Sequence, residues 1–60
     1  MKHVEVTAQR GESVWVLECA AAGVVSQCED LSEADAEMRE AIAHQLGLEV
    51  GGFVIDLVQM

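Results

Sequence analysis

The sequence has little positive charge. Its 60 residues include eleven acidic residues but only three lysines and arginines, Lys2, Arg10 and Arg39. A surface that binds a phosphate backbone needs clustered lysine and arginine, so the net charge of −8 argues against direct nucleic-acid binding. Trp15 and Phe53 are the only aromatic residues, too few for a platform that stacks single-stranded bases. The acidic field would instead attract a basic protein, and it also keeps a small apolar domain soluble.

Cysteines and long hydrophobic runs are scarce as well. Cys19 and Cys28 are too few for a disulfide framework, and their spacing is not that of a zinc site. No run approaches the roughly 18 apolar residues of a membrane span, and "MKHVEVTAQR" lacks the apolar segment of a signal peptide. These absences predict a cytoplasmic protein without membrane association and with both thiols reduced.

Proline is absent, and the five glycines punctuate the sequence rather than form a linker. Residues 1–60 are therefore expected to form one domain. A chain of this length buries only about 60% of the surface that its unfolded form exposes, so we expect it to need a binding partner or another stabilising element.

Three strands are predicted in the first half of the sequence. In "HVEVTA", residues 3–8, apolar and polar side chains alternate with the period of a half-buried strand. "SVWVLEC", residues 13–19, indicates a strand that is apolar on both faces. "VVSQC", residues 24–28, gives a third strand, and the short connections predict an antiparallel meander.

A helix is predicted to follow Asp30, which forms with Glu33 the D-x-x-E pattern of a capping box. Gly47 suits its C-terminal cap, and Asp35 and Arg39 are spaced to form an ion pair. Apolar residues recur at three- and four-residue spacing and predict one buried stripe of Leu31, Ala34, Met38, Ala41, Ile42 and Leu46.

A final strand is predicted in "GGFVIDLVQ", with Phe53, Ile55 and Leu57 on one face and Val54 and Val58 on the other. The element order is then β-β-β-α-β, an α+β fold with the helix on one face of a four-stranded sheet. A right-handed crossover through the helix makes the last strand parallel to the first.

Candidate catalytic groups are few. Cys28 precedes the predicted helix, where the pKa of a thiol can fall, but thiol catalysis also needs a histidine base. His44 lies near the far end of the helix, and no spacing links His3 to either cysteine. Cys19, in apolar surroundings, is expected in the core. We predict no catalytic residue and no cofactor; an enzyme or ligand-binding domain that uses Cys28 or the acids is an alternative.

No metal site is predicted either. Glu33, Glu37 and Glu40 share one helical face, but the sequence contains no zinc or calcium motif. Glu5 and Asp56 could complete an acidic cluster with a helix glutamate only if all three met on one side of the sheet. The alternation instead points Glu5 and Asp56 away from the helix.

The predicted sheet is wider than its helix, because four strands about 4.8 Å apart exceed a helix diameter of about 10 Å. Apolar residues are also expected on its second face: Trp15, Leu17, Val54 and Val58. Exposed apolar surface marks an association site, so we predict a homo-oligomer, most simply a dimer, joined through the sheet.

Segments across nearly the whole chain resemble the N-terminal domain of HicB-like antitoxins. They are "HVEVTAQRGESVWVLEC", "AAGVVSQCEDLSEADAEMREAIAHQLG" and the closing apolar strand. Residues 23–27, 28–30 and 31–34 stand where the family shows a "GCVTQ"-like strand, a polar turn and an "LEEA" helix start. Ala22 replaces a proline that is common in the family. No ribbon-helix-helix or helix-turn-helix module follows within the 60 residues, so operator binding is not expected of this chain.

The resemblance implies a partial ribonuclease-H-like fold and the role of antitoxin in a type II HicAB toxin–antitoxin pair. Such domains bind HicA, a small basic RNA-cleaving toxin, and block its catalytic surface. The leading hypothesis is a non-enzymatic module that binds a basic protein, with Glu33, Glu37 and Glu40 as its candidate surface. A domain that only self-assembles, without a toxin partner, is a further alternative.

Overall fold

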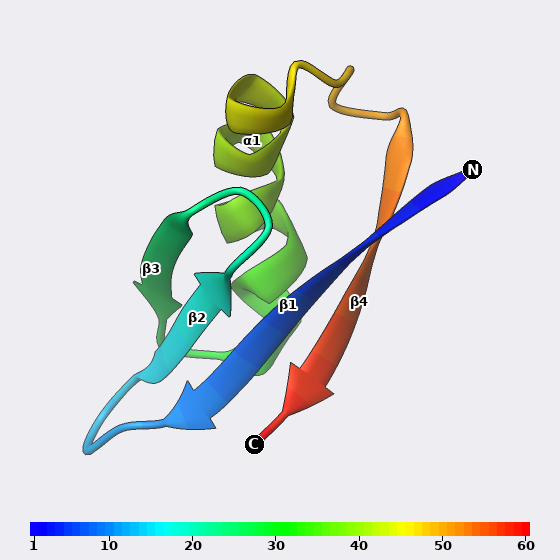
Figure 1. The fold of residues 1–60 in the computed structure, drawn as a ribbon. Helices are drawn as coiled ribbons and strands as arrows, with labels where there is room; N and C mark the ends of the chain where they lie inside the picture. The colour runs from blue at the N-terminus through cyan, green and yellow to red at the C-terminus, as the bar shows by residue number, and fades with distance from the viewer.

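A four-stranded sheet with one helix on one face makes up the computed structural model, which describes residues 1–60 (Figure 1). The strands lie in the order β3-β2-β1-β4, and β1 pairs antiparallel with β2 and parallel with β4. The predicted α+β fold, its element order and its parallel pairing of the first and last strands are confirmed. In chain order the elements are β1 (Lys2–Arg10), β2 (Trp15–Cys19), β3 (Val24–Cys28), a 3₁₀ turn (Leu31–Glu33), α1 (Ala34–Leu46) and β4 (Phe53–Gln59).

The alternation predicted for the first strand is present in β1. Val4, Val6 and Ala8 are buried on the side of the sheet that faces α1, so the residues between them point to the opposite side. Ala8 pairs with Leu17 of β2, which places Leu17 and Cys19 on the buried side as well. Cys19 is fully buried, as expected for a core cysteine.

Two of the four residues predicted on the second face lie on the first. Leu17 is fully buried beneath α1, and Trp15 is half-buried on the same side and packs against the core. The prediction was wrong because an apolar run without a polar break does not show its own alternation. The pairing of Leu17 with Ala8 decides which way its side chain points. Val54 and Val58 do lie on the face away from the helix, beside residues 3 and 7 of β1.

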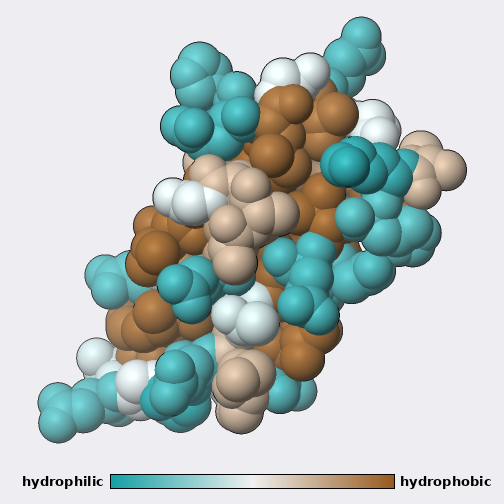
Figure 2. Space-filling model, viewed as in Figure 1, coloured by the Kyte–Doolittle hydropathy of each residue, from teal (hydrophilic) through white to brown (hydrophobic).

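The face of the sheet away from α1 is mixed in polarity rather than apolar. Polar and apolar groups are interspersed in Figure 2. A sheet face of such mixed polarity can remain in contact with water. The strand registers place on this face Val16, Val25, Val54 and Val58 with His3, Glu5, Thr7, Gln9, Glu18, Gln27 and Asp56.

The helix begins and ends where its capping residues predict. The Ser32 N–H donates to Asp30 Oδ1 at 2.9 Å, and the Asp30 N–H donates to Glu33 Oε1 at 3.4 Å, which completes the capping box. The first turn is 3₁₀, and Gly47 ends α1 in the left-handed region at φ 66°. The predicted stripe is wrong at Ala41, which is exposed; Ala43 is buried instead.

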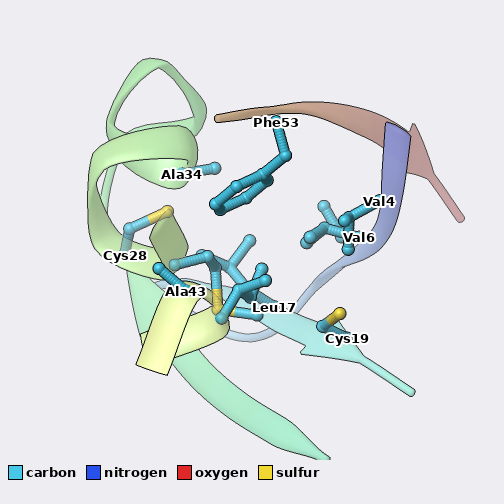
Figure 3. Packing of buried hydrophobic residues seen from close by; sticks show 11 residues of the cluster. Val4, Val6, Leu17, Cys19, Cys28, Ala34, Ala43 and Phe53 are labelled. Atoms are coloured by element: carbon cyan, nitrogen blue, oxygen red, sulfur yellow. The ribbon is translucent and has the colours of Figure 1, made fainter. Parts of the chain in front are cut away.

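The core lies between α1 and the sheet, as Figure 3 shows. Phe53 enters it from the first position of β4 with only 2% of its surface exposed, and its ring lies between Ala34 of α1 and the valines of β1. Met38 and Ile42, four residues apart on α1, are fully buried. Full burial of an apolar side chain of this size contributes about 1.5–3 kcal/mol, so these contacts hold the helix to the sheet.

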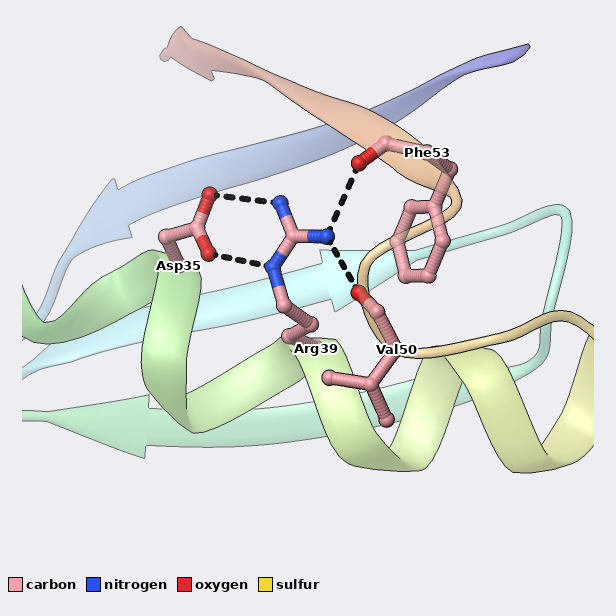
Figure 4. Close-up of polar contacts among 4 residues, drawn as sticks. All are labelled: Asp35, Arg39, Val50 and Phe53. Carbon is pink, nitrogen blue, oxygen red and sulfur yellow. Dashed lines mark hydrogen bonds and ion pairs between the residues drawn. The ribbon is translucent and has the colours of Figure 1, made fainter. Parts of the chain in front are cut away.

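Arg39 ties α1 to the loop that leads into β4, as Figure 4 shows. Its Nε and Nη2 donate to the two carboxylate oxygens of Asp35 at 2.8 and 3.2 Å, so the predicted ion pair is confirmed. Its Nη1 donates to the carbonyl oxygens of Val50 and Phe53 at 2.7 and 2.8 Å. The guanidinium carbon also lies 4.6 Å from the centroid of the Phe53 ring. One side chain therefore satisfies a loop carbonyl and the first carbonyl of β4, and so positions the start of that strand.

The packing of the core predicts the cost of a small cavity. Ile42→Val removes one buried methyl group and should lower the free energy of unfolding by about 0.5–1.5 kcal/mol. Val25 is 66% exposed, so the matched variant Val25→Thr should change that free energy by less than about 0.5 kcal/mol. Urea denaturation followed by circular dichroism measures both values. Equal values for the two variants would contradict the burial described above.

The Asp35–Arg39 pair predicts a pH dependence of stability. Hydrogen bonding to Arg39 holds the pKa of Asp35 below its ordinary value. A carboxyl group with a lowered pKa stabilises the fold above its unfolded pKa of about 3.9 and loses that effect as the pH falls through the folded value. Asp35→Asn should therefore lower the urea midpoint at pH 7, and its midpoint should converge with the wild-type value as the pH falls below the folded pKa of Asp35.

Glu40→Gln is the control for the Asp35 variant, because Glu40 lies on the same helix without a basic partner. Its urea midpoint should stay close to the wild-type value at every pH. A difference between Asp35→Asn and the wild type that persists unchanged at low pH would show that the variant acts through packing rather than through charge.

Candidate functional site: an acidic groove where the helix begins

An open groove of about 580 Å³ lies between the end of β3 and the first turns of α1. Glu29, Glu33 and Glu37 contribute its three charged side chains, and we call these residues and their surroundings the acidic groove. The rest of the lining is small or neutral: Val14, Gln27, Cys28, Ser32 and Ala36. The groove therefore presents only negative charge to whatever enters it.

The tight connection between β3 and α1 brings these carboxylates together. Asp30 caps the helix two residues after β3 ends, so Glu29 stays beside the first helical turn. Glu33 and Glu37 are four apart and lie above one another on one side of the helix. The Ser26 hydroxyl of β3 donates to Glu37 Oε1 at 3.4 Å, which links the far wall of the groove to the sheet. Acids in a first helical turn also complement the partial positive charge of its unpaired N–H groups.

Few of the acids have basic partners. Asp35 pairs with Arg39, and Asp56 lies 3.0 Å from His3 Nδ1. Nine of the eleven acidic residues therefore contact no basic side chain, including all three in the groove. Arg39 lies on the same helix, but its guanidinium is engaged with Asp35 and the loop before β4. The negative charge of the groove is not compensated within the chain.

The structure brings together two of the three residues predicted to bind a partner. Glu33 and Glu37 line the groove, whereas Glu40 is exposed on α1 outside it. Glu29 was missed, because its place at the junction made it look like a helix-start residue only. No helical spacing could have found it, since Glu29 precedes the extended N-cap Asp30 and lies outside the helix.

Cys28 borders the acidic groove, but its environment disfavours a reactive thiolate. Burial, followed by the carboxylates of Glu33, Glu37 and Asp30, raises the pKa of the Cys28 thiol above its ordinary value. His44 lies in the last turn of α1, and His3 lies on the other face of the sheet. Neither histidine is placed to take a proton from this thiol, so the arrangement does not favour nucleophilic catalysis.

The remaining carboxylates follow the predicted separation by face. Glu5 and Asp56 are partners in the parallel pairing of β1 with β4, on the side away from α1. The helix glutamates lie on the other side of the sheet and cannot join them. No three histidine, cysteine, aspartate or glutamate side chains are close enough together to hold a metal ion.

Comparisons with known protein families, with curated protein sequences and with solved structures gave no significant match. The one α-helix, with 13 residues, is too short to cross a membrane.

The raised pKa of Cys28 predicts slow alkylation. In the native protein at pH 7, iodoacetamide should modify Cys28 more slowly than it modifies the urea-unfolded chain, because the thiolate is the reactive form. The rate should rise only as the pH passes the range where ordinary thiols ionise, about 8.5. Mass spectrometry after timed quenching measures the extent of labelling at each cysteine.

The double variant Glu33→Gln, Glu37→Gln provides the control for the alkylation experiment. It removes two of the carboxylates that raise the pKa of Cys28, so labelling at a fixed pH near 8.5 should become faster than in the wild type. Rapid and selective labelling of wild-type Cys28 at pH 7 would contradict the environment described here and would return the thiol to consideration as a nucleophile.

Proposed function

We propose that this chain is a non-enzymatic protein-binding module of the HicB antitoxin type that binds a small basic protein through its acidic groove. The observation that carries the proposal is the concentration of uncompensated carboxylates, Glu29, Glu33 and Glu37, around one concave surface. Lysine and arginine side chains of a partner would supply the charge that this surface lacks. Charge complementarity of this kind accelerates association and selects against acidic partners and nucleic acids.

The shape of the site supports binding of side chains rather than of a small substrate. The groove is shallow and open, and its polar groups are carboxylates without a neighbouring histidine or a reactive thiolate. An arginine entering it could form paired hydrogen bonds with a carboxylate, a geometry that lysine cannot reproduce. The groove is also held on regular elements, β3 and the capped start of α1, so its carboxylates are positioned before a partner arrives.

The resemblance to HicB-like antitoxins supplies the class of partner. A ribonuclease toxin carries basic residues that contact RNA phosphates, and an acidic surface that occupies those residues would prevent RNA from binding. Neutralisation then requires no chemistry by this chain. It requires only that the acidic groove compete with RNA for the same basic side chains.

The test is capture of a partner by variants with equal charge. The triple variant Glu29→Gln, Glu33→Gln, Glu37→Gln should bind a basic partner from the lysate of its host at least about tenfold more weakly than wild type, a loss of about 1.4 kcal/mol. The control Glu5→Gln, Glu18→Gln, Glu49→Gln removes the same three charges elsewhere and should bind as wild type does. Binding to wild type should weaken as salt is added.

The captured protein should then be assayed for cleavage of RNA with and without the wild-type chain. Inhibition by wild type and by the control variant, with loss of inhibition in the groove variant, is the expected outcome. Equal weakening by both triple variants would mean that net charge, not the groove, attracts the partner. Capture of a partner that is not basic, or that does not cleave RNA, would overturn the proposed function.

A further inference from the structure

The outer edge of β4 is an unpaired strand edge without the usual protection. β4 is the last strand in the order β3-β2-β1-β4, so only its inner edge is hydrogen-bonded. Exposed edges in monomeric proteins normally carry lysine, proline, a bulge or a covering loop, because a bare edge pairs with other chains. The segment Phe53–Gln59 contains no lysine and no proline, and it pairs with β1 without interruption.

The direction of the backbone groups on β4 follows from one hydrogen bond at its end. The Met60 N–H donates to the Ala8 carbonyl oxygen at 2.8 Å, so residue 60 points inward toward β1. Backbone groups alternate in direction along a strand, so the N–H and C=O groups of Ile55, Leu57 and Gln59 point outward. Phe53 points outward by the same alternation, but its carbonyl oxygen already accepts a hydrogen bond from Arg39 and is not free to pair. Three consecutive outward positions therefore remain free to pair.

Exposed apolar side chains also occur on β4 and at its end. Three of the seven large hydrophobic residues that are exposed are Leu57, Val58 and Met60. Leu57 and Val58 are 38% and 39% exposed on opposite faces of the strand, so both faces have apolar surface left to bury. The helix packs mainly on β3, and β4 is exposed from Asp56 to Gln59.

The charge distribution indicates which kind of chain would pair with the edge of β4. Asp56 is the only charged residue of β4, and its carboxylate already contacts His3. β4 thus carries a single carboxylate, whereas Glu29, Glu33 and Glu37 lie together at the opposite end of the sheet beside β3. Two chains that each carry a net charge of −8 can approach most easily where few carboxylates lie. The edge of β4 suits a second copy of the chain.

We infer that two copies associate through antiparallel pairing of their β4 strands about a two-fold axis at Leu57. In this register Leu57 faces Leu57 of the second copy, Ile55 faces Gln59, and Asp56 faces Val58. The outward groups at residues 55, 57 and 59 then pair as hydrogen-bonded partners. A register shifted by one residue and centred on Asp56 would place two carboxylates directly opposite each other, which is destabilising. The pairing joins two sheets into one and leaves both acidic grooves at its distant ends.

Sedimentation equilibrium with edge variants tests this interface. Wild type at submillimolar concentration should have a mass of 13 kDa, twice the 6.5 kDa of one chain. Leu57→Lys and Leu57→Glu should each sediment as one chain, because like charges would meet at the axis. An equimolar mixture of these two variants should recover the mass of two chains, which shows in addition that both variants fold. Val25→Lys, on the opposite edge strand β3, is the control and should sediment as wild type does.

Single-cysteine cross-linking tests the register. Directly opposed hydrogen-bonded residues have Cα atoms about 5.5 Å apart, within the range of a disulfide. Leu57→Cys should therefore form a covalent dimer under mild oxidation, and Asp56→Cys should not. A wild-type mass of 6.5 kDa at submillimolar concentration, dissociation by Val25→Lys rather than Leu57→Lys, or cross-linking only of Asp56→Cys would each overturn the inference.

Discussion

The structure depends on one constraint: a single short helix covers only part of a four-stranded sheet. Thirteen residues of α1 extend about 20 Å at 1.5 Å per residue, and the capped turn at Asp30 attaches the helix directly to the end of β3. The helix is therefore held mainly over β3. β4, on the far side of β1, reaches the helix through Phe53 and through the hydrogen bonds of Arg39 to the loop before it.

Both candidate surfaces follow from this unequal coverage. Where the helix meets β3, the short connection crowds Glu29 against Glu33 and Glu37 and leaves their charge without a partner. Where the helix does not reach, β4 keeps an open edge with apolar side chains and almost no charge. The carboxylates of the groove are thus clustered at the β3 side of the sheet, whereas β4 itself carries one. One surface suits a basic protein and the other suits a second copy of the same chain, so the two associations would not compete.

Much of the fold could be predicted because local signals agreed with each other. The alternation in β1, the capping box at Asp30 and Glu33, and Gly47 each specify a local geometry, and the crossover rule then leaves one arrangement for β4. The failures arose where the deciding information lies in another part of the chain. Leu17 belongs to an apolar run, and only its pairing with Ala8 determines its face. Ala41 and Ala43 are chemically equivalent, and the angle at which the helix sits on the sheet decides between them.

The candidate site could be predicted less completely, for a similar reason. Glu33 and Glu37 share a helix face at a spacing that can be read directly, but the groove also needs Glu29, which comes from the end of a strand. The contacts of Arg39 with the carbonyls of Val50 and Phe53 depend on the path of a loop, for which the sequence contains no periodic signal. His3 and Asp56 meet only because the first and last strands are neighbours.

The parallel pairing of β1 with β4 also has a consequence for biosynthesis. Lys2 pairs with Phe53, so β1 lacks its β4 partner until a segment about fifty residues later has been synthesised. Until then, Val4 and Val6 have no neighbour on one side and no Phe53 ring above them. Because loop closure over such a distance carries an entropic cost that local contacts do not repay, the nascent chain can form the local β1–β2 and β2–β3 pairings and the helix before the completed sheet.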